Sequence, residues 1–146
     1  MSLYGVNVSG ESLAAATTET LIQGVAGAKK IELVRWGVSF NGVTNTDAPV
    51  LVELIRLSSA GTSAAFVPVK LNPSDDAPLM TARTSHTAEP TNGDVLERHY
   101  VTPAGGNLVL QYAYDERVSV AAVGRLGIRV QASAIVSAAA FMIFDE

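Results

Sequence analysis

The stretch Val34-Arg35-Trp36-Gly37-Val38-Ser39-Phe40 decides the fold class, because every second residue in it is apolar. The even-numbered positions hold valine, tryptophan, valine and phenylalanine, whereas the odd-numbered ones hold arginine, glycine and serine. Such alternation is typical of a β-strand with one face on a core and the other toward solvent or a partner. Upstream, Ile31 and Leu33 are apolar in the opposite phase, which predicts a bulge near Leu33.

A second strand is expected at residues 50–57, beyond a loop that Asn41-Gly42 opens and residues 46–49 close. It is apolar on both faces apart from Glu53 and Arg56, as a central strand of a sandwich would be. The sequence therefore predicts a sheet with strands on both sides of residues 50–57.

Further short strands are expected where apolar runs lie between turn residues. They cover residues 19–25, 66–71, 95–101, 107–112, 125–131 and 135–144. The last run is apolar throughout, so we expect burial on both of its faces. Pro68 has no backbone N–H to donate to a neighbouring strand, which predicts a position at the edge of a sheet for residues 66–71. Residues 73–82 are expected to hold one helical turn with Ser74 as its cap.

About eight short strands at near-regular spacing, without a long helix, predict one all-β domain spanning residues 1–146. The expected architecture is an antiparallel β-sandwich, and eight strands favour a jelly roll. The pattern does not give the strand order. The apolar phase of the strands predicts a core of Val34, Trp36, Val38, Leu54, Leu126, Ile128 and Val130.

Composition narrows the classes of function. Charged residues make up only 16% of the 146 residues, and the net charge is −4 without a basic cluster. Nucleic-acid binding, which needs a positive surface, is therefore not expected. No apolar run approaches the roughly 20 residues that span a bilayer, and the first residues do not resemble a signal peptide. We expect a protein kept in an aqueous compartment, with no membrane partner.

No catalytic centre or cofactor site is expected from the residue types. The chain has no cysteine, which removes thiol chemistry and cysteine-based zinc sites. Its two histidines, His86 and His99, lie in different elements, so a shared metal site is not expected. Many serines are present, but none lies in a Gly-x-Ser-x-Gly nucleophile motif.

Carboxylates remain as an alternative source of chemistry. A glycosidase pair or a Ca²⁺ site could be drawn from Asp75, Asp76, Glu89, Asp94 and Glu97. Asp75 and Asp76 follow Pro73-Ser74, where turn and helix-start roles suit them better. We therefore expect no enzyme and no bound cofactor.

Four arginines lie within strand patterns, where an unpaired guanidinium is costly to bury. They are Arg35, Arg56, Arg125 and Arg129. In one interpretation each lies on a solvent face or pairs across strands with Glu32, Glu53 or Glu97. In the other they are subunit-interface residues, because arginine is enriched at interfaces.

Three stretches carry a family resemblance. They are residues 35–42 with 49–54 (RWGVSFNG and PVLVEL), Thr87-Ala88-Glu89-Pro90-Thr91, and Gly124-Arg125-Leu126-Gly127-Ile128-Arg129. In that order, over Lys30 to Glu146, the chain resembles small virion structural proteins of tailed bacteriophages. It is similar in kind to jelly-roll head-decoration (cement) proteins.

The resemblance implies a homo-oligomer, expected as a trimer, that binds the major capsid protein on the outer surface of the virion. Such a protein would be made in the host cytoplasm. Residues 1–18 are polar or small and could be a flexible arm that orders on a neighbour.

A receptor- or carbohydrate-binding sandwich module of a phage fibre or tail tip is the alternative. It would need a groove with exposed aromatic rings. Trp36 lies in an apolar phase and is expected in the core, which leaves Tyr112 and Tyr114 for that role.

Overall fold

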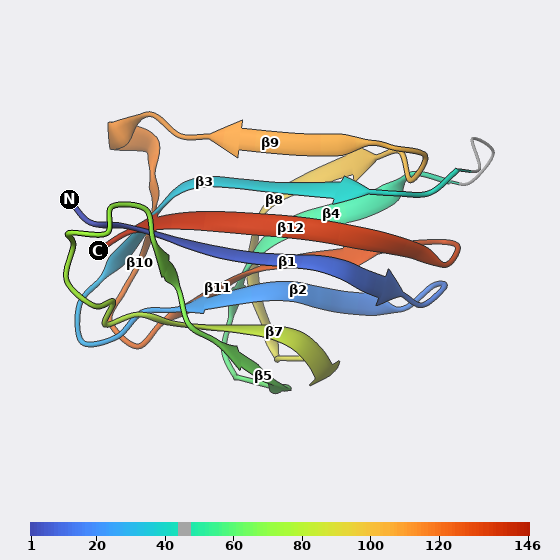
Figure 1. Cartoon of the computed structure of the whole chain (residues 1–146). Coiled ribbons are helices and arrows are strands. Elements are labelled where there is room, and N and C mark those ends of the chain that lie inside the picture. Colours follow the sequence, from blue (N-terminus) through green and yellow to red (C-terminus); the bar gives the residue numbers. More distant parts are fainter. Residues whose placement is uncertain (44–47) are drawn as a thin grey trace.

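The computed structural model describes residues 1–43 and 48–146, and there the chain forms twelve strands and one three-residue 3₁₀ helix, η1 (Tyr114–Glu116) (Figure 1). The strands are β1 (Leu3–Leu13), β2 (Thr18–Val25), β3 (Ile31–Phe40), β4 (Val50–Leu57), β5 (Thr62–Phe66), β6 (Val69–Lys70), β7 (Thr81–Ala88), β8 (Asn92–Val101), β9 (Asn107–Gln111), β10 (Val118–Val120), β11 (Arg125–Gln131) and β12 (Val136–Asp145). In this part of the chain no helix is both long and apolar enough to span a membrane.

Two antiparallel six-stranded sheets pack face to face, which confirms the predicted sandwich. Sheet A has the order β10-β3-β12-β1-β6, and β9 pairs with β3 beside β10. Sheet B has the order β5-β7-β2-β11-β4-β8. Within them, β1-β12-β3-β9 faces β2-β11-β4-β8, and the chain passes from one sheet to the other between successive strands such as β1, β2, β3 and β4. This is the jelly-roll arrangement of eight strands, to which β5, β6, β7 and β10 are added.

The core lies between the two sheets. Six of the seven predicted core residues are buried, and Trp36 has no exposed surface. The exception is Val34, which is only half-buried. The register of β3 against β12 shifts there, since Ile143 pairs with Arg35 but Phe144 pairs with Leu33. The bulge predicted near Leu33 is thus present, and it takes Val34 out of the inward phase.

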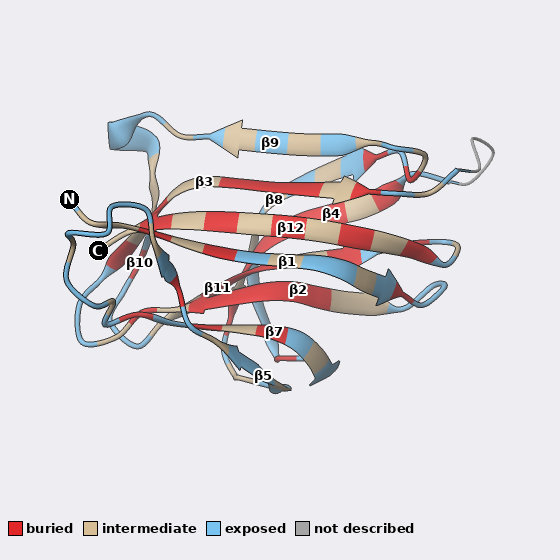
Figure 2. Cartoon of the chain, viewed as in Figure 1, coloured by how far each residue is buried: buried red, intermediate tan, exposed pale blue. Residues whose placement is uncertain are grey.

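Strand β12 is buried on one face only, so the expectation of burial on both faces was wrong. Buried and half-buried residues alternate along its whole length (Figure 2). The side chains of Ala139, Phe141 and Ile143 face outward and stay partly exposed, because the described chain places no further layer over the outer face of sheet A.

Residues 3–13 do not form the flexible arm expected of residues 1–18, because they are strand β1 and pair with β12 in the middle of sheet A. Tyr4 and Val6 alternate inward as in the other strands. The pattern then breaks at Gly10, which has a φ of 66° and lies in a register shift between Val8 and Glu11. That bulge hides the alternation in the sequence.

The segment between β4 and β8 differs most from expectation. Pro68 splits the strand expected at residues 66–71 into the end of β5 and the two-residue β6. Residues 73–82 hold no helical turn. A turn begins instead at Asn72, whose side chain accepts a hydrogen bond from the backbone N–H of Ser74 (3.1 Å). Strand β7 was not expected. The expected turn at residues 46–49 falls partly outside the described residues.

Candidate functional site

Two of the four strand arginines, Arg125 and Arg129 of β11, lie on the outer face of sheet B, where they have partners within the chain. Arg129 donates to Glu53 of the neighbouring strand β4 with an N···O distance of 2.8 Å. Arg98 of β8 donates to the other oxygen of the same carboxylate, also at 2.8 Å. Glu53 is 6% exposed, so the carboxylate that joins the three strands is largely removed from solvent. Cross-strand pairing with Glu53, one of the two interpretations of the sequence, therefore holds for Arg129.

Burial and ion pairing act in opposite directions on Glu53. Desolvation of the carboxylate alone would raise its pKa, but hydrogen bonds from Arg98 and Arg129 outweigh it and hold the pKa below its ordinary value. Glu53 is thus ionised at neutral pH and links β8, β4 and β11.

Arg125, the second of the two strand arginines on the outer face of sheet B, donates to the side-chain oxygen of Gln23 on β2 (2.6 Å). Arg56 donates to the Ser119 carbonyl oxygen (3.1 Å) and so connects β4 to β10 of the other sheet. Three of the four candidate interface residues therefore serve contacts inside the chain. A role for them between subunits stays a prediction.

The chain itself covers much of the outer face of sheet B. The Gln23 side chain donates to the Ala60 carbonyl oxygen (3.2 Å), which holds the segment after β4 over the sheet. Glu89, one of the carboxylates considered for catalysis, accepts from the backbone N–H of Thr20 (2.8 Å) and fixes the segment after β7. Ile55, on the same side of β4 as Glu53, has no exposed surface. The middle of this face is therefore largely covered, whereas Tyr100 and Arg98 at its β8 edge stay exposed.

The outer face of sheet A is open, and three rows in cross-strand register form its middle. The first row is Gly5, Ile143, Arg35 and Gln111; the second is Asn7, Phe141, Gly37 and Val109; the third contains Ala139, Ser39 and Asn107. Apart from Arg35 these residues carry no charge, and most of them are small or apolar. The middle of the open face is therefore nearly neutral, whereas the next row toward β10 holds Glu32 and Asp145.

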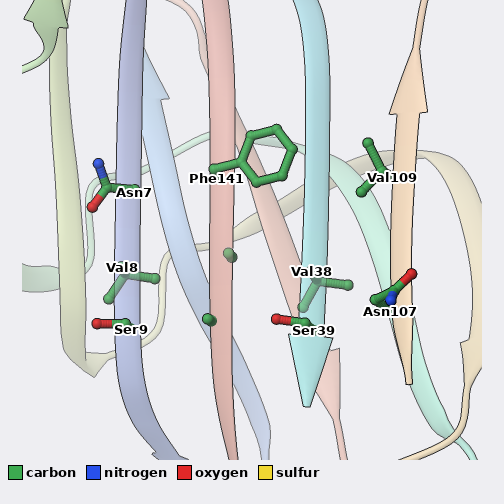
Figure 3. Close-up of a pocket in the computed structure, with 10 residues that line it drawn as sticks. Asn7, Val8, Ser9, Val38, Ser39, Asn107, Val109 and Phe141 are labelled. Carbon is green, nitrogen blue, oxygen red and sulfur yellow. The ribbon is translucent and has the colours of Figure 1, made fainter. Parts of the chain in front are cut away.

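A groove of about 320 Å³ crosses this face along the second and third rows (Figure 3). We call it the Phe141 groove, and its outward-facing residues are Asn7, Ser9, Ser39, Asn107, Val109, Ala139 and Phe141. Figure 3 shows the Phe141 ring reaching from β12 toward β3. It lies over Gly37, where a Cβ atom would come within 2.6 Å of the ring. The glycine thus makes room for the ring.

Arg35 is the one strand arginine with an unsatisfied donor. Its Nε is buried and has no hydrogen-bond partner among the described residues. The guanidinium carbon lies 5.5 Å from the centre of the Phe141 ring, within range of a cation–π contact. A hollow of about 210 Å³ surrounds Arg35, and we call its lining the Arg35 patch: Leu3, Val34, Arg35, Leu71, Gln111 and Ile143.

No protein-family model matches this chain, and no curated protein matches it either. The candidate site is therefore the outer face of sheet A, where the Phe141 groove and the Arg35 patch lie.

The histidines are not brought together. His99 faces inward at the β8 edge, with its Nε2 3.1 Å from Glu97 and its ring 6.2 Å from that of Trp36. His86 lies on β7 with both ring nitrogens buried, and this burial lowers its pKa. Over residues 1–43 and 48–146, no three histidine or acidic side chains are placed to hold a metal ion.

Glu97 and Tyr112 instead support the core. The Tyr112 hydroxyl donates to Glu97 and accepts from the Trp36 Nε1 (3.0 Å). Burial and the hydrogen bond to Glu97 raise the pKa of Tyr112, so this hydroxyl stays protonated. Tyr112 is therefore a support for Trp36 rather than the exposed ring of a binding groove. Tyr114, in η1, is 73% exposed, and the guanidinium carbon of Arg117 lies 4.8 Å from the centre of its ring.

Proposed function

We propose that this chain is a bacteriophage structural protein, a capsid decoration (cement) protein that binds the outer capsid surface as a homo-oligomer and stabilises the particle. The observation that carries the proposal is the asymmetry of the two sheets. The chain covers much of the outer face of sheet B, whereas the weakly charged outer face of sheet A is open. An open, weakly charged face that carries exposed apolar side chains is typical of surfaces that associate with other proteins.

Self-association is proposed through the Arg35 patch. Leu71 is 47% exposed there, beside the buried and unpartnered Nε of Arg35. A neighbouring subunit would bury Leu71 and pack against the Arg35 side chain, whose Nε the chain itself already covers. The resemblance to cement proteins supports a trimer and a contact with the major capsid protein. On a capsid the same weak contact is repeated many times, and the binding free energies of the copies add up.

Replacing Leu71 by aspartate should dissociate the oligomer without unfolding the subunit. Loss of a buried leucine at a contact costs about 1.5–3 kcal/mol per site, which is roughly a tenfold to hundredfold loss of affinity. Light scattering coupled to size exclusion should give three times the chain mass for the parent and a lower mass for Leu71→Asp. Ile135→Asp is the matched control, because Ile135 is 76% exposed and lies outside sheet A. A parent that is monomeric at tens of micromolar would contradict the proposal.

The capsid role has its own experiment. The purified protein should bind to capsids that lack it, at a fixed stoichiometry, and raise the temperature at which they open. Leu71→Asp should bind far more weakly and Ile135→Asp should match the parent. Absence of binding by the parent would refute the decoration role.

A further inference from the structure

The Phe141 groove has features that self-association does not explain. We propose that it is a binding site for a short, neutral oligosaccharide. The groove occupies the second and third rows of the open face, beside the Arg35 patch, which includes three of the four residues of the first row. This site goes beyond the proposed decoration role and is tested separately from it.

The shape of the groove follows from side-chain size across the register. Phe141 is a large ring whose neighbours are small: Gly37 pairs with it on β3, and Ala139 pairs with Ser39 in the next row. A Cβ atom at Gly37 would also lie 2.8 Å from the Leu108 carbonyl oxygen, so only glycine fits between the ring and β9. One aromatic ring above a floor of small residues leaves a trough with an apolar side.

The walls of the trough carry polar groups that are free to bind. The side chains of Asn7 and Ser9 on β1 and of Ser39 and Asn107 on β3 and β9 make no hydrogen bond to other described residues. Each amide or hydroxyl can both donate and accept. A sugar hydroxyl has the same double capacity, and the C–H surface of a sugar ring suits the apolar Phe141 side.

Charge and backbone pairing favour this ligand over others. No charged side chain lines the groove, so a neutral ligand is complementary to it. The Arg35 guanidinium borders it on the first-row side, where its carbon lies 5.5 Å from the centre of the Phe141 ring. The floor strands β12 and β3 each have neighbours on both sides, so their backbone groups are used in the ladders. An extended peptide would find no backbone partner on this floor. A ligand with hydroxyls around its periphery can instead bind side chains on both walls.

The length of the trough indicates more than one sugar ring. Strands β1 and β9 are three strand spacings apart in the order β1-β12-β3-β9, or about 14 Å. The groove volume of about 320 Å³ lies at the small end of ligand pockets. The expected ligand is therefore a short oligosaccharide that lies across the strands.

Titration of the full-length parent with maltotriose, cellotriose and N,N′,N″-triacetylchitotriose tests the proposal, with backbone amide NMR shifts and calorimetry as readouts. At least one trisaccharide should bind with a dissociation constant in the millimolar range or tighter and shift residues of the groove. Phe141→Ala should weaken binding at least tenfold. Asn107→Ala should weaken it by about twofold to tenfold, the range expected for one hydrogen bond.

Tyr100→Ala is the matched control, because Tyr100 is a 76% exposed ring on β8 of sheet B and should leave binding unchanged. Sialyllactose should bind no better than the neutral sugars. The proposal is overturned if none of the three trisaccharides binds at millimolar concentration, or if Phe141→Ala leaves their binding intact. It is also overturned if Asn107→Ala lowers the mass of the oligomer, because a second copy would then cover the groove. If only Leu71→Asp lowers the mass of the oligomer, the result bears on the decoration role and not on the sugar site.

Discussion

Replacing Trp36 by alanine should lower the free energy of unfolding by about 3–5 kcal/mol, the range for removing a large buried aromatic side chain. Trp36 has no exposed surface, lies on β3 of sheet A and donates from Nε1 to the Tyr112 hydroxyl (3.0 Å). Its removal leaves a cavity between the sheets and also leaves that hydroxyl without its donor. Urea denaturation followed by circular dichroism measures the loss, since Trp36 is the only tryptophan and fluorescence would vanish with it.

Trp36→Phe separates the two contributions. It keeps an aromatic ring in the core but removes the indole donor, so we expect a smaller loss of about 1–2 kcal/mol. A Trp36→Ala variant within 1 kcal/mol of the parent would show that the core closes around the missing ring and would refute the prediction.

Glu53→Ala should cost about 3 kcal/mol at neutral pH, because it leaves Arg129 without its carboxylate in a largely buried position. The side chain of Arg129 is 12% exposed, whereas that of Arg98 is 65% exposed. Arg98→Ala should therefore cost less than 1 kcal/mol, as exposed ion pairs do. Equal losses in the two variants would contradict this account of the bridge.

The same carboxylate predicts an acid sensitivity. The pKa of Glu53 is lower in the folded chain than its ordinary value of 4.5. Its stabilising effect is therefore fully present above that ordinary value and is lost as the pH falls through the folded pKa. Glu53→Gln should show less of this acid loss than the parent when unfolding is measured between neutral pH and pH 3. An unchanged pH profile would show that other groups dominate.

The fold was predictable where alternation reports a buried face. β4 was predicted to the residue because its inward side chains are large and regular, and β3 was predicted from Val34 to Phe40 although it begins at Ile31, before the bulge. β1 was missed because the bulge at Gly10 shifts the phase, and β7 because hydroxyl, histidine and arginine side chains replace the apolar signal. β12 was expected to be buried on both faces because its outward residues are mostly apolar as well, and an apolar side chain does not show whether another layer covers it.

The candidate site depends on pairings that local patterns do not contain. Arg125 and its partner Gln23 are 102 residues apart, and the walls of the Phe141 groove come from β1 and β9. The aromatic rings considered for a binding role, Tyr112 and Tyr114, lie elsewhere. One signal was present in the sequence: Gly37 takes an outward position in an otherwise regular strand, and a glycine there indicates a large side chain on a neighbour.

The position of β12 has a consequence for synthesis of the chain. The residues of β12 leave the ribosome after all the other strands, yet β12 lies between β1 and β3 and pairs with both along nearly its whole length. Until it emerges, β1 and β3 have no neighbour on that side, and their facing edges are unpaired. The nascent chain must therefore keep these edges apart from those of other nascent chains, and sheet A completes after translation of residues 136–145 rather than strand by strand.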